Sequence, residues 1–141
     1  MPREREIQFP ANGMPRVICY CRVAQKDRVA LEYQKKMLLD YCATKRYEVA
    51  QVVCETVSGV QDKNFLRRWF HFPKQKGLGI ALRAAKKKKV DGVVSVSASR
   101  ISRHAPTLLD FIHALYARGV FVETKYEGRL ESMIPLLRMA G

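Results

Sequence analysis

The sequence lacks the features that mark several common classes of protein. It contains no run of about 18 consecutive apolar residues, so we expect no segment that crosses a membrane. Residues 1–15 are charged, contain proline and glycine and have no long apolar stretch, which predicts a flexible tail and not a signal peptide. Neither a G-x-x-x-x-G-K-S/T nor a G-x-G-x-x-G loop occurs, which counts against a nucleotide- or phosphate-binding α/β enzyme.

Cysteine and histidine are too few and too scattered for a zinc site. The three histidines form no cluster, and the four cysteines lie in apolar runs, at Cys19, Cys21, Cys42 and Cys54. The C-x-C pair has no second pair at zinc-site spacing, so we expect no metal and no cofactor. Buried free thiols of a cytoplasmic protein are a better explanation of these cysteines than disulfides.

Acidic residues are also scarce, and the basic charge is unevenly distributed. The chain has 26 Lys and Arg against 13 Asp and Glu, a net charge of +13. Residues 60–104 contain twelve of the basic residues and two acids, whereas the net charge of residues 105–141 is zero. A positive charge concentrated in this way favours binding to a polyanion, with nucleic acid the first candidate and an anionic membrane the second. A basic surface without a binding partner explains the charge equally well.

The apolar pattern switches repeatedly between strand and helix periods. Apolar, β-branched runs predict strands over residues 17–23, 48–54, 90–97 and 120–124. Helical spacing predicts helices over residues 28–47, 77–89 and 106–118, with loops at 55–76 and 98–105. This alternation in a chain of one-domain size predicts a three-layer α/β fold, with a mainly parallel sheet and helices on both faces.

Polar residues follow three of the predicted strands. They are Arg22 and Ala24, then Glu55 and Ser58, then Ser99, Arg100, Ser102 and Arg103. Ligands of open α/β sheets bind outside the carboxyl ends of the strands, so we expect the three arginines to converge there. Guanidinium groups pair well with phosphodiesters and can stabilise phosphoryl transfer without a metal.

Each of these residues also has a structural explanation. Arg22 could form a buried ion pair with Glu55, and Arg100 and Arg103 could be ordinary loop residues. Gln34 lies on the apolar stripe of the first helix, where it should either bond to backbone or point into the site. Lys86 to Lys89 are expected to form a solvated helix end.

Five short motifs occur together in a recognisable order. They are YCRV ending the first strand, LEYQ on the following helix, SG after the second strand, GL opening the next helix, and SRISR after the third strand. As a set, they resemble the catalytic domain of serine site-specific recombinases, the resolvase/invertase family. The resemblance runs from about Arg16 to Glu123.

The resemblance implies DNA strand cleavage and exchange. A serine two residues after the strand-end arginine would attack a phosphodiester, and an arginine cluster would stabilise the transition state without metal. The catalytic positions implied are Arg22, Ala24, Gln34, Arg100 and Arg103. The DNA-binding positions are Ser58, Arg67, Arg68, Lys76 and Ser99.

The chain departs from the family pattern at several positions. Ala24 stands at the nucleophile position, Ser99 where an aspartate is usual, and Gln75 where an arginine is usual; Arg67 or Arg68 would compensate for the last. Alternation along the first strand turns Cys21 away from the arginines, so it is not expected to replace the serine.

The resemblance also divides the chain. We expect a catalytic domain over residues 16–126 and a shortened start of the family's interface helix over residues 127–141. No C-terminal DNA-reading domain is expected after it.

The predicted function is that of a serine-type site-specific DNA recombinase. With Ala24 in place of the serine, we expect this recombinase to be impaired or inactive. The alternative is a non-catalytic DNA-binding or recombinase-partner accessory protein with the same fold. The expected partners are DNA and a second copy of the chain in a dimer, or a partner recombinase, in the cytoplasm and without membrane contact.

Overall fold

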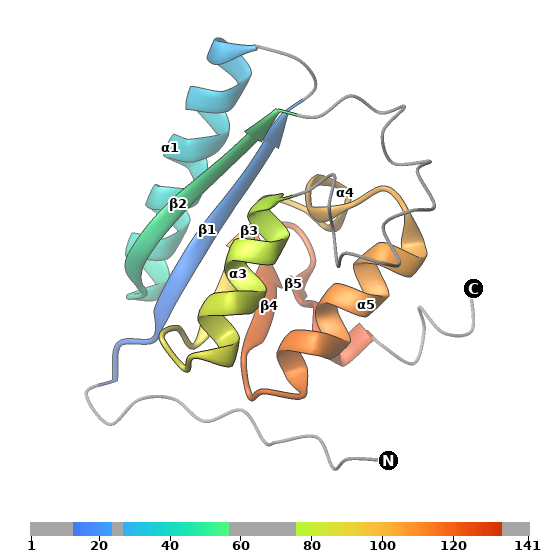
Figure 1. Cartoon of the computed structure of the whole chain (residues 1–141). Helices are drawn as coiled ribbons and strands as arrows, with labels where there is room; N and C mark the ends of the chain where they lie inside the picture. Colours follow the sequence, from blue (N-terminus) through green and yellow to red (C-terminus); the bar gives the residue numbers. More distant parts are fainter. Residues whose placement is uncertain (1–12, 24–26, 57–75, 134–141) are drawn as a thin grey trace.

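The fold is a single five-stranded sheet between two layers of helices (Figure 1). The computed structural model describes residues 13–23, 27–56 and 76–133. The strand order is β2-β1-β3-β4-β5, and the strands are β1 (Arg16–Val23), β2 (Glu48–Thr56), β3 (Gly92–Ser95), β4 (Phe121–Thr124) and β5 (Gly128–Arg129). The first four are parallel, and β5 pairs antiparallel with β4 at one edge.

The helices cover both faces of this sheet. They are α1 (Arg28–Lys45), α3 (Lys76–Lys86), α4 (Ala98–Ile101) and α5 (Ala105–Tyr116), and the 3-10 turn η2 (Leu130–Met133) follows β5. Helix α1 packs on one face, while α3, α4 and α5 lie on the other (Figure 1). The predicted α/β fold class, with a mainly parallel sheet and helices on both faces, is therefore confirmed.

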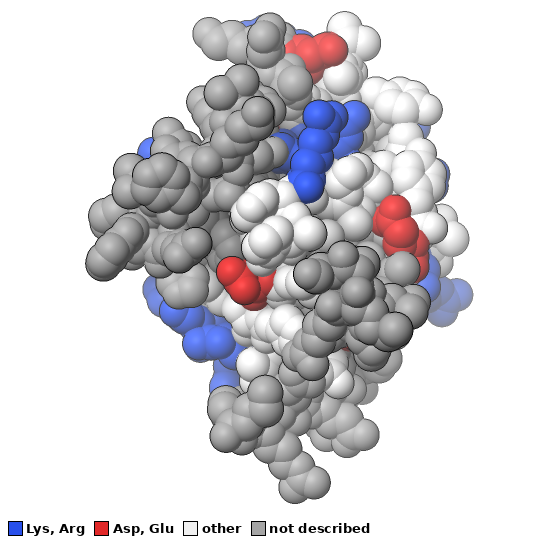
Figure 2. Space-filling view, turned by 90° about the vertical axis from the view of Figure 1, so that its right-hand side faces the viewer, with Lys and Arg blue, Asp and Glu red and all other residues white. Residues whose placement is uncertain are grey.

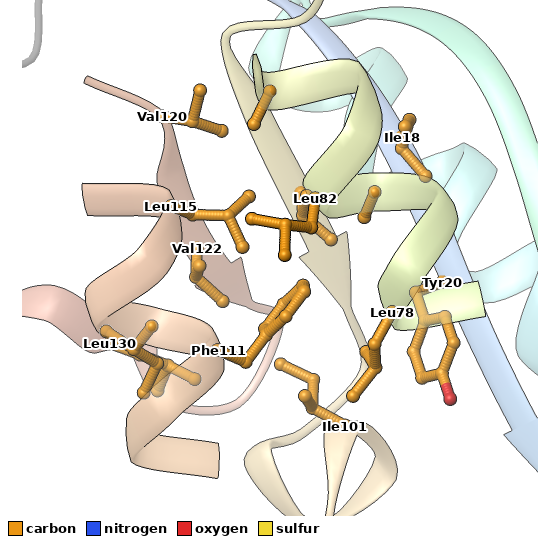
Figure 3. Packing of buried hydrophobic residues seen from close by; sticks show 14 of the residues in the cluster. Ile18, Tyr20, Leu78, Leu82, Ile101, Phe111, Leu115, Val120, Val122 and Leu130 are labelled. Atoms are coloured by element: carbon orange, nitrogen blue, oxygen red, sulfur yellow. The ribbon is translucent and has the colours of Figure 1, made fainter. Parts of the chain in front are cut away.

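Two apolar clusters fill the space between the layers. On the face of α3 and α5, side chains such as Leu82, Phe111 and Leu115 meet over the sheet (Figure 3). On the α1 face, the cluster is built from β1, α1 and the adjoining strands and includes Cys19 and Leu38. Alternate residues of β1 enter opposite clusters, so both faces of this strand are buried.

The structure corrects the prediction for residues 98–105. A loop was expected there, but residues 98–101 form the helical turn α4, and α5 already begins at Ala105. The turn is closed by N–H groups at its end that donate to carbonyl groups at its start: Arg100 N to Ser97 O and Ser102 N to Ala98 O, both at 3.1 Å. A second contact comes from far along the chain, since Ala98 N donates to Glu127 Oε1 at 2.8 Å.

The start of the interface helix was expected over residues 127–141. In the described residues, Glu127 lies in a turn, Gly128 and Arg129 form β5, and only Leu130–Met133 are helical, as the 3-10 turn η2. Thr124 Oγ1 donates to Glu127 Oε1 at 2.6 Å, and Glu127 N donates back to Thr124 Oγ1 at 2.8 Å, which closes a turn. Gly128 then has φ of +76°, outside the right-handed helical region, and pairs with Thr124 as β5. Residues 134–141 lie outside the described part of the chain.

The cysteine prediction holds in part. Cys19, Cys21 and Cys42 are buried, as expected, but Cys54 is exposed because β2 is an edge strand of the sheet. None of the helices that the structure describes is long and apolar enough to span a bilayer.

Candidate functional site

Gln34 completes the hydrogen bonding of β1 where a neighbouring strand stops. The pairing of β1 with β3 runs from Val17 to Cys19, whereas its pairing with β2 continues to Val23. Beyond β3, the side chain of Gln34 contacts the backbone of Arg22: Oε1 accepts from Arg22 N at 3.0 Å, and Nε2 donates to Arg22 O at 3.1 Å. Of the two alternatives for Gln34, the structure has the one in which it bonds to backbone.

The buried side chain of Arg22 is tied to α4. It is 6% exposed, and its Nε donates to the carbonyl oxygen of Arg100 at 3.0 Å. Its Nη2 donates to the carbonyl oxygen of Ser99 at 2.6 Å. Carbonyl groups of a helical turn are good acceptors for a cation, so this contact offsets part of the cost of burying the guanidinium. It also fixes the position of α4 relative to the end of β1.

The two arginines that follow β3 are held differently. Arg100 is half-buried, and its Nη1 donates to the carbonyl oxygen of Arg22 at 3.3 Å. Arg22 and Arg100 therefore each donate to the backbone carbonyl oxygen of the other. Arg103 is exposed, beyond the end of α4. Ser99 is exposed as well, and its hydroxyl lies 3.0 Å from that of Ser97.

Glu55, at the end of β2, contacts the first turn of α3. Its carboxylate accepts a hydrogen bond from Gly77 N. A Cβ on Gly77 would lie 2.7 Å from atoms of Tyr20 and Val53, so only glycine allows the helix to begin this close to the sheet. Burial raises the pKa of Glu55, and the Gly77 N–H and the charge of Arg22 oppose that rise.

Strand alternation sends Cys21 and Arg22 to opposite faces, as predicted. Cys21 lies in the cluster under α1, while Arg22 reaches α4 on the other face. Burial raises the pKa of the Cys21 thiol to about 12, so this group is a poor nucleophile as well as badly placed.

The structure thus brings together four of the ten residues predicted for the site. The four are Arg22, Gln34, Ser99 and Arg100. Arg103 and Lys76 are exposed, the latter as the first residue of α3. The remaining positions lie outside the described residues: Ala24, Ser58, Arg67 and Arg68. Within residues 13–23, 27–56 and 76–133, no three His, Cys, Asp or Glu side chains gather as metal ligands.

Sequence reasoning missed the carbonyl groups of Ser99 and Arg100, which are the hydrogen-bonding partners of the Arg22 side chain. A backbone oxygen carries no sequence signal of its own. The only available indication was indirect: a buried arginine requires acceptors, and the segment after β3 is the nearest one at that edge of the sheet.

A mainly parallel α/β sheet with arginines at its carboxyl edge defines a class of domains suited to binding oxyanions. The family can be stated more closely. Residues 17–134 match the family model described as "Resolvase, N terminal domain", and the chain belongs to this family. It is thus a domain of the site-specific serine recombinase type, a family that implies DNA binding and oligomerisation.

Solved structures share the fold at low sequence identity. A resolvase family site-specific recombinase from Streptococcus pneumoniae has a TM-score of 0.70 and 19% identity, over 89% of this chain and 85% of that one. The N-terminal catalytic domain of TP901-1 integrase has a TM-score of 0.65 and 18% identity, over 88% of this chain and 89% of that one. The C-terminal catalytic domain of ISC1926 TnpA, an IS607-like serine recombinase, has a TM-score of 0.64 and 22% identity, over 89% of this chain and 79% of that one. No curated protein matches the chain.

Proposed function

We propose that this chain binds a DNA phosphodiester at the carboxyl end of its sheet but does not cleave the strand. In this proposal Arg100 and Arg103 contact the phosphate, and Arg22 positions the backbone of Arg100. The observation that carries the proposal is the tie between the buried Arg22 and α4, with Nε and Nη2 on two successive carbonyl oxygens. A rigid support of this kind holds the backbone of Arg100 in one place, so that its side chain can meet a phosphate in a fixed position.

Ala24 is the reason for proposing no cleavage. In serine-type cleavage, a hydroxyl oxygen attacks phosphorus, an enzyme–phosphate bond forms, and the bond to the leaving sugar oxygen breaks. The methyl group of Ala24 has no oxygen to form that bond. The chain as written would therefore contribute phosphate binding and assembly, and the covalent step would require a serine at this position or in a partner subunit.

The partners follow from the same proposal. Additional DNA contacts are assigned to Ser58, Arg67, Arg68, Lys76 and Ser99. Lys76 and Ser99 are exposed, as a direct contact requires. The chain would act as a homodimer or beside a catalytically complete recombinase, in the cytoplasm where its DNA lies.

The decisive experiment restores the nucleophile. Supercoiled DNA that carries a recombination site is incubated with the unmodified chain, with Ala24→Ser, and with Ala24→Ser combined with Arg100→Ala. We expect covalent protein–DNA adducts with Ala24→Ser alone. Adducts with the unmodified chain would show that another residue attacks, and equal adducts in the double variant would remove Arg100 from the site.

Binding is tested separately from cleavage. Arg100→Ala and Arg103→Ala should each weaken duplex affinity and reduce the salt dependence of binding by about one phosphate contact. The matched control is Lys36→Ala, an exposed cation on α1 that pairs with Asp40 at 3.1 Å. Affinities equal to that of the control would leave both arginines as structural residues.

A further inference from the structure

Three helix-to-strand turns lie together at the amino end of the sheet, the end opposite Arg22. They connect α1 to β2, α3 to β3 and α5 to β4, at the lower end of the sheet in Figure 1. All three close with the same pair of backbone hydrogen bonds. In the first, Tyr47 N donates to Cys42 O at 2.8 Å and Arg46 N to Ala43 O at 3.2 Å. The other two repeat this pattern around Lys88 and around Gly119, respectively.

The residue at the centre of each turn has a left-handed backbone. Its φ is +60° at Arg46, +55° at Lys88 and +74° at Gly119. Glycine adopts this conformation without strain and is the usual residue there, whereas a side chain with a Cβ is strained. Among the described residues, Arg46 and Lys88 are the only two non-glycine residues with positive φ, and both are exposed cations.

The helix dipole does not account for these two cations. A cation in the last turn of a helix is stabilised by the carbonyl groups there. That requirement is already met one residue earlier in each turn, by Lys45, Lys87 and Arg118. The turn after α5 shows the unstrained solution, with a cation followed by Gly119. In the other two turns, a second cation occupies the strained position although glycine would serve the fold better.

The surrounding surface is strongly basic. We define the amino-end patch by six exposed residues: Arg46, Lys86, Lys87, Lys88, Lys89 and Arg118. Two acids lie at the same end of the sheet and are outnumbered by these six cations: Asp91 Oδ2 accepts from Arg16 N at 2.7 Å, and Glu48 lies 3.9 Å from the guanidinium of Arg16. Figure 2 shows Lys and Arg side chains gathered at the lower left, apart from those higher in the same view.

We propose that the amino-end patch is a second surface for the sugar–phosphate backbone of DNA, separate from the arginines at the carboxyl end. Flexible, exposed lysines suit backbone contacts, which need charge rather than exact geometry. The two ends of the eight-residue β1 are about 23 Å apart, since seven steps of 3.3 Å separate them, and this exceeds the Debye length of about 10 Å at 0.1 M salt. The two surfaces therefore attract DNA independently, and the second one takes another duplex segment.

The test removes two charges from the patch and compares the result with a matched variant. Affinity for a 30-base-pair duplex of arbitrary sequence is measured over a salt series for Lys87→Gln/Lys88→Gln and for Lys35→Gln/Lys36→Gln on α1. Both variants lose the same charge. The patch variant should lose about tenfold in affinity at 0.1 M salt, and its salt slope should fall by about two, while the control stays near the unmodified chain.

A second variant guards against loss of folding. Lys88→Gly removes one patch charge and relieves the left-handed strain, so it should bind DNA more weakly although it is more stable. Equal affinity and slope for the patch variant and the α1 control would overturn the proposal.

The inference builds on the DNA-binding family of the chain, and its failure can be told apart from that of the proposed function. If Arg100→Ala/Arg103→Ala binds normally while the patch variant is weakened, the carboxyl-end site fails and the amino-end patch stands. If only the arginine variant is weakened, the patch fails and the carboxyl-end site stands.

Discussion

The carboxyl and amino ends of the sheet both carry cations but hold them in different ways. At the carboxyl end, Arg22 is 6% exposed and its guanidinium is fixed by two carbonyl oxygens of another segment. At the amino end, Arg46 and Lys88 are exposed, and only the backbone of their turns is fixed. Tertiary hydrogen bonds place the first cation, and local turn geometry places the others.

This difference matches two kinds of electrostatic task. Stabilising a reacting phosphate requires donors placed to within about an ångström, which only a packed and hydrogen-bonded side chain provides. Attracting the DNA backbone requires positive charge near the surface and tolerates mobile side chains. The comparison suggests that stability depends strongly on polar contacts at the carboxyl end and little on charge at the amino end.

Replacing Gln34 should give the largest change in stability. Gln34→Met keeps the length of a side chain that is 5% exposed but removes both hydrogen bonds to Arg22. The buried N–H of Arg22 would lose this partner, and we expect the free energy of unfolding to fall by about 2 kcal/mol. Urea denaturation measures the change, with Lys36→Met on the exposed side of α1 as control. If both variants change by less than about 0.5 kcal/mol, the carboxyl end does not depend on this contact.

A smaller change, of opposite sign, is expected at the amino end. Lys88→Gly relieves a left-handed backbone with φ of +55° and should raise the free energy of unfolding by about 1 kcal/mol. Gly119→Ala introduces the same strain at φ of +74° and should lower it by a similar amount. Thermal unfolding of the two variants side by side checks the pair. A loss of stability in Lys88→Gly would mean that the lysine makes a stabilising contact, and the argument from strain would fail.

The sequence predicted those parts of the carboxyl end that follow from periodicity. Alternation along β1 correctly separated Cys21 from Arg22, and helical spacing placed Gln34 on the buried stripe of α1. Whether Gln34 bonds to backbone depends on where β3 stops pairing with β1, after Cys19. That register is a property of the folded sheet and is not encoded near Gln34.

Two short segments could not have been predicted from local pattern. Helix α4 has four residues, too few for a helical period to show, and Ala98 N at its start donates to Glu127 Oε1, 29 residues later. An interface helix was expected to start within residues 127–130, but Gly128 and the hydrogen bonds between Thr124 and Glu127 first turn the chain back into the sheet. The role of Ala24, outside the described residues, stays a prediction from the resemblance.

The smallest expected effect is a difference between two carboxylates, the half-buried Glu55 and the buried Glu123, in how they change stability with pH. Burial raises the pKa of Glu55 above its ordinary value of 4.5, so the folded chain holds this proton to higher pH than the unfolded chain. Between 4.5 and the raised value the folded state binds more protons, and the free energy of unfolding falls as pH rises. Glu55→Gln removes this titration, so the variant should gain stability relative to the unmodified chain as pH rises from 4 to 7.

Glu123 provides the control of opposite sign. Burial alone would raise its pKa, but hydrogen bonds from Tyr41, Arg129 and Tyr47 outweigh burial and lower it. Its contribution to stability is therefore present above its ordinary value of 4.5 and is lost as pH falls. Glu123→Gln should lose stability relative to the unmodified chain as pH rises, the reverse of Glu55→Gln. Parallel trends in urea denaturation at pH 4, 5.5 and 7 would contradict the assignment of Glu55 as a carboxylate that is costly to ionise. In that case the Gly77 N–H and the charge of Arg22 together would outweigh its burial, and the carboxyl end would stabilise anions more strongly than its burial suggests.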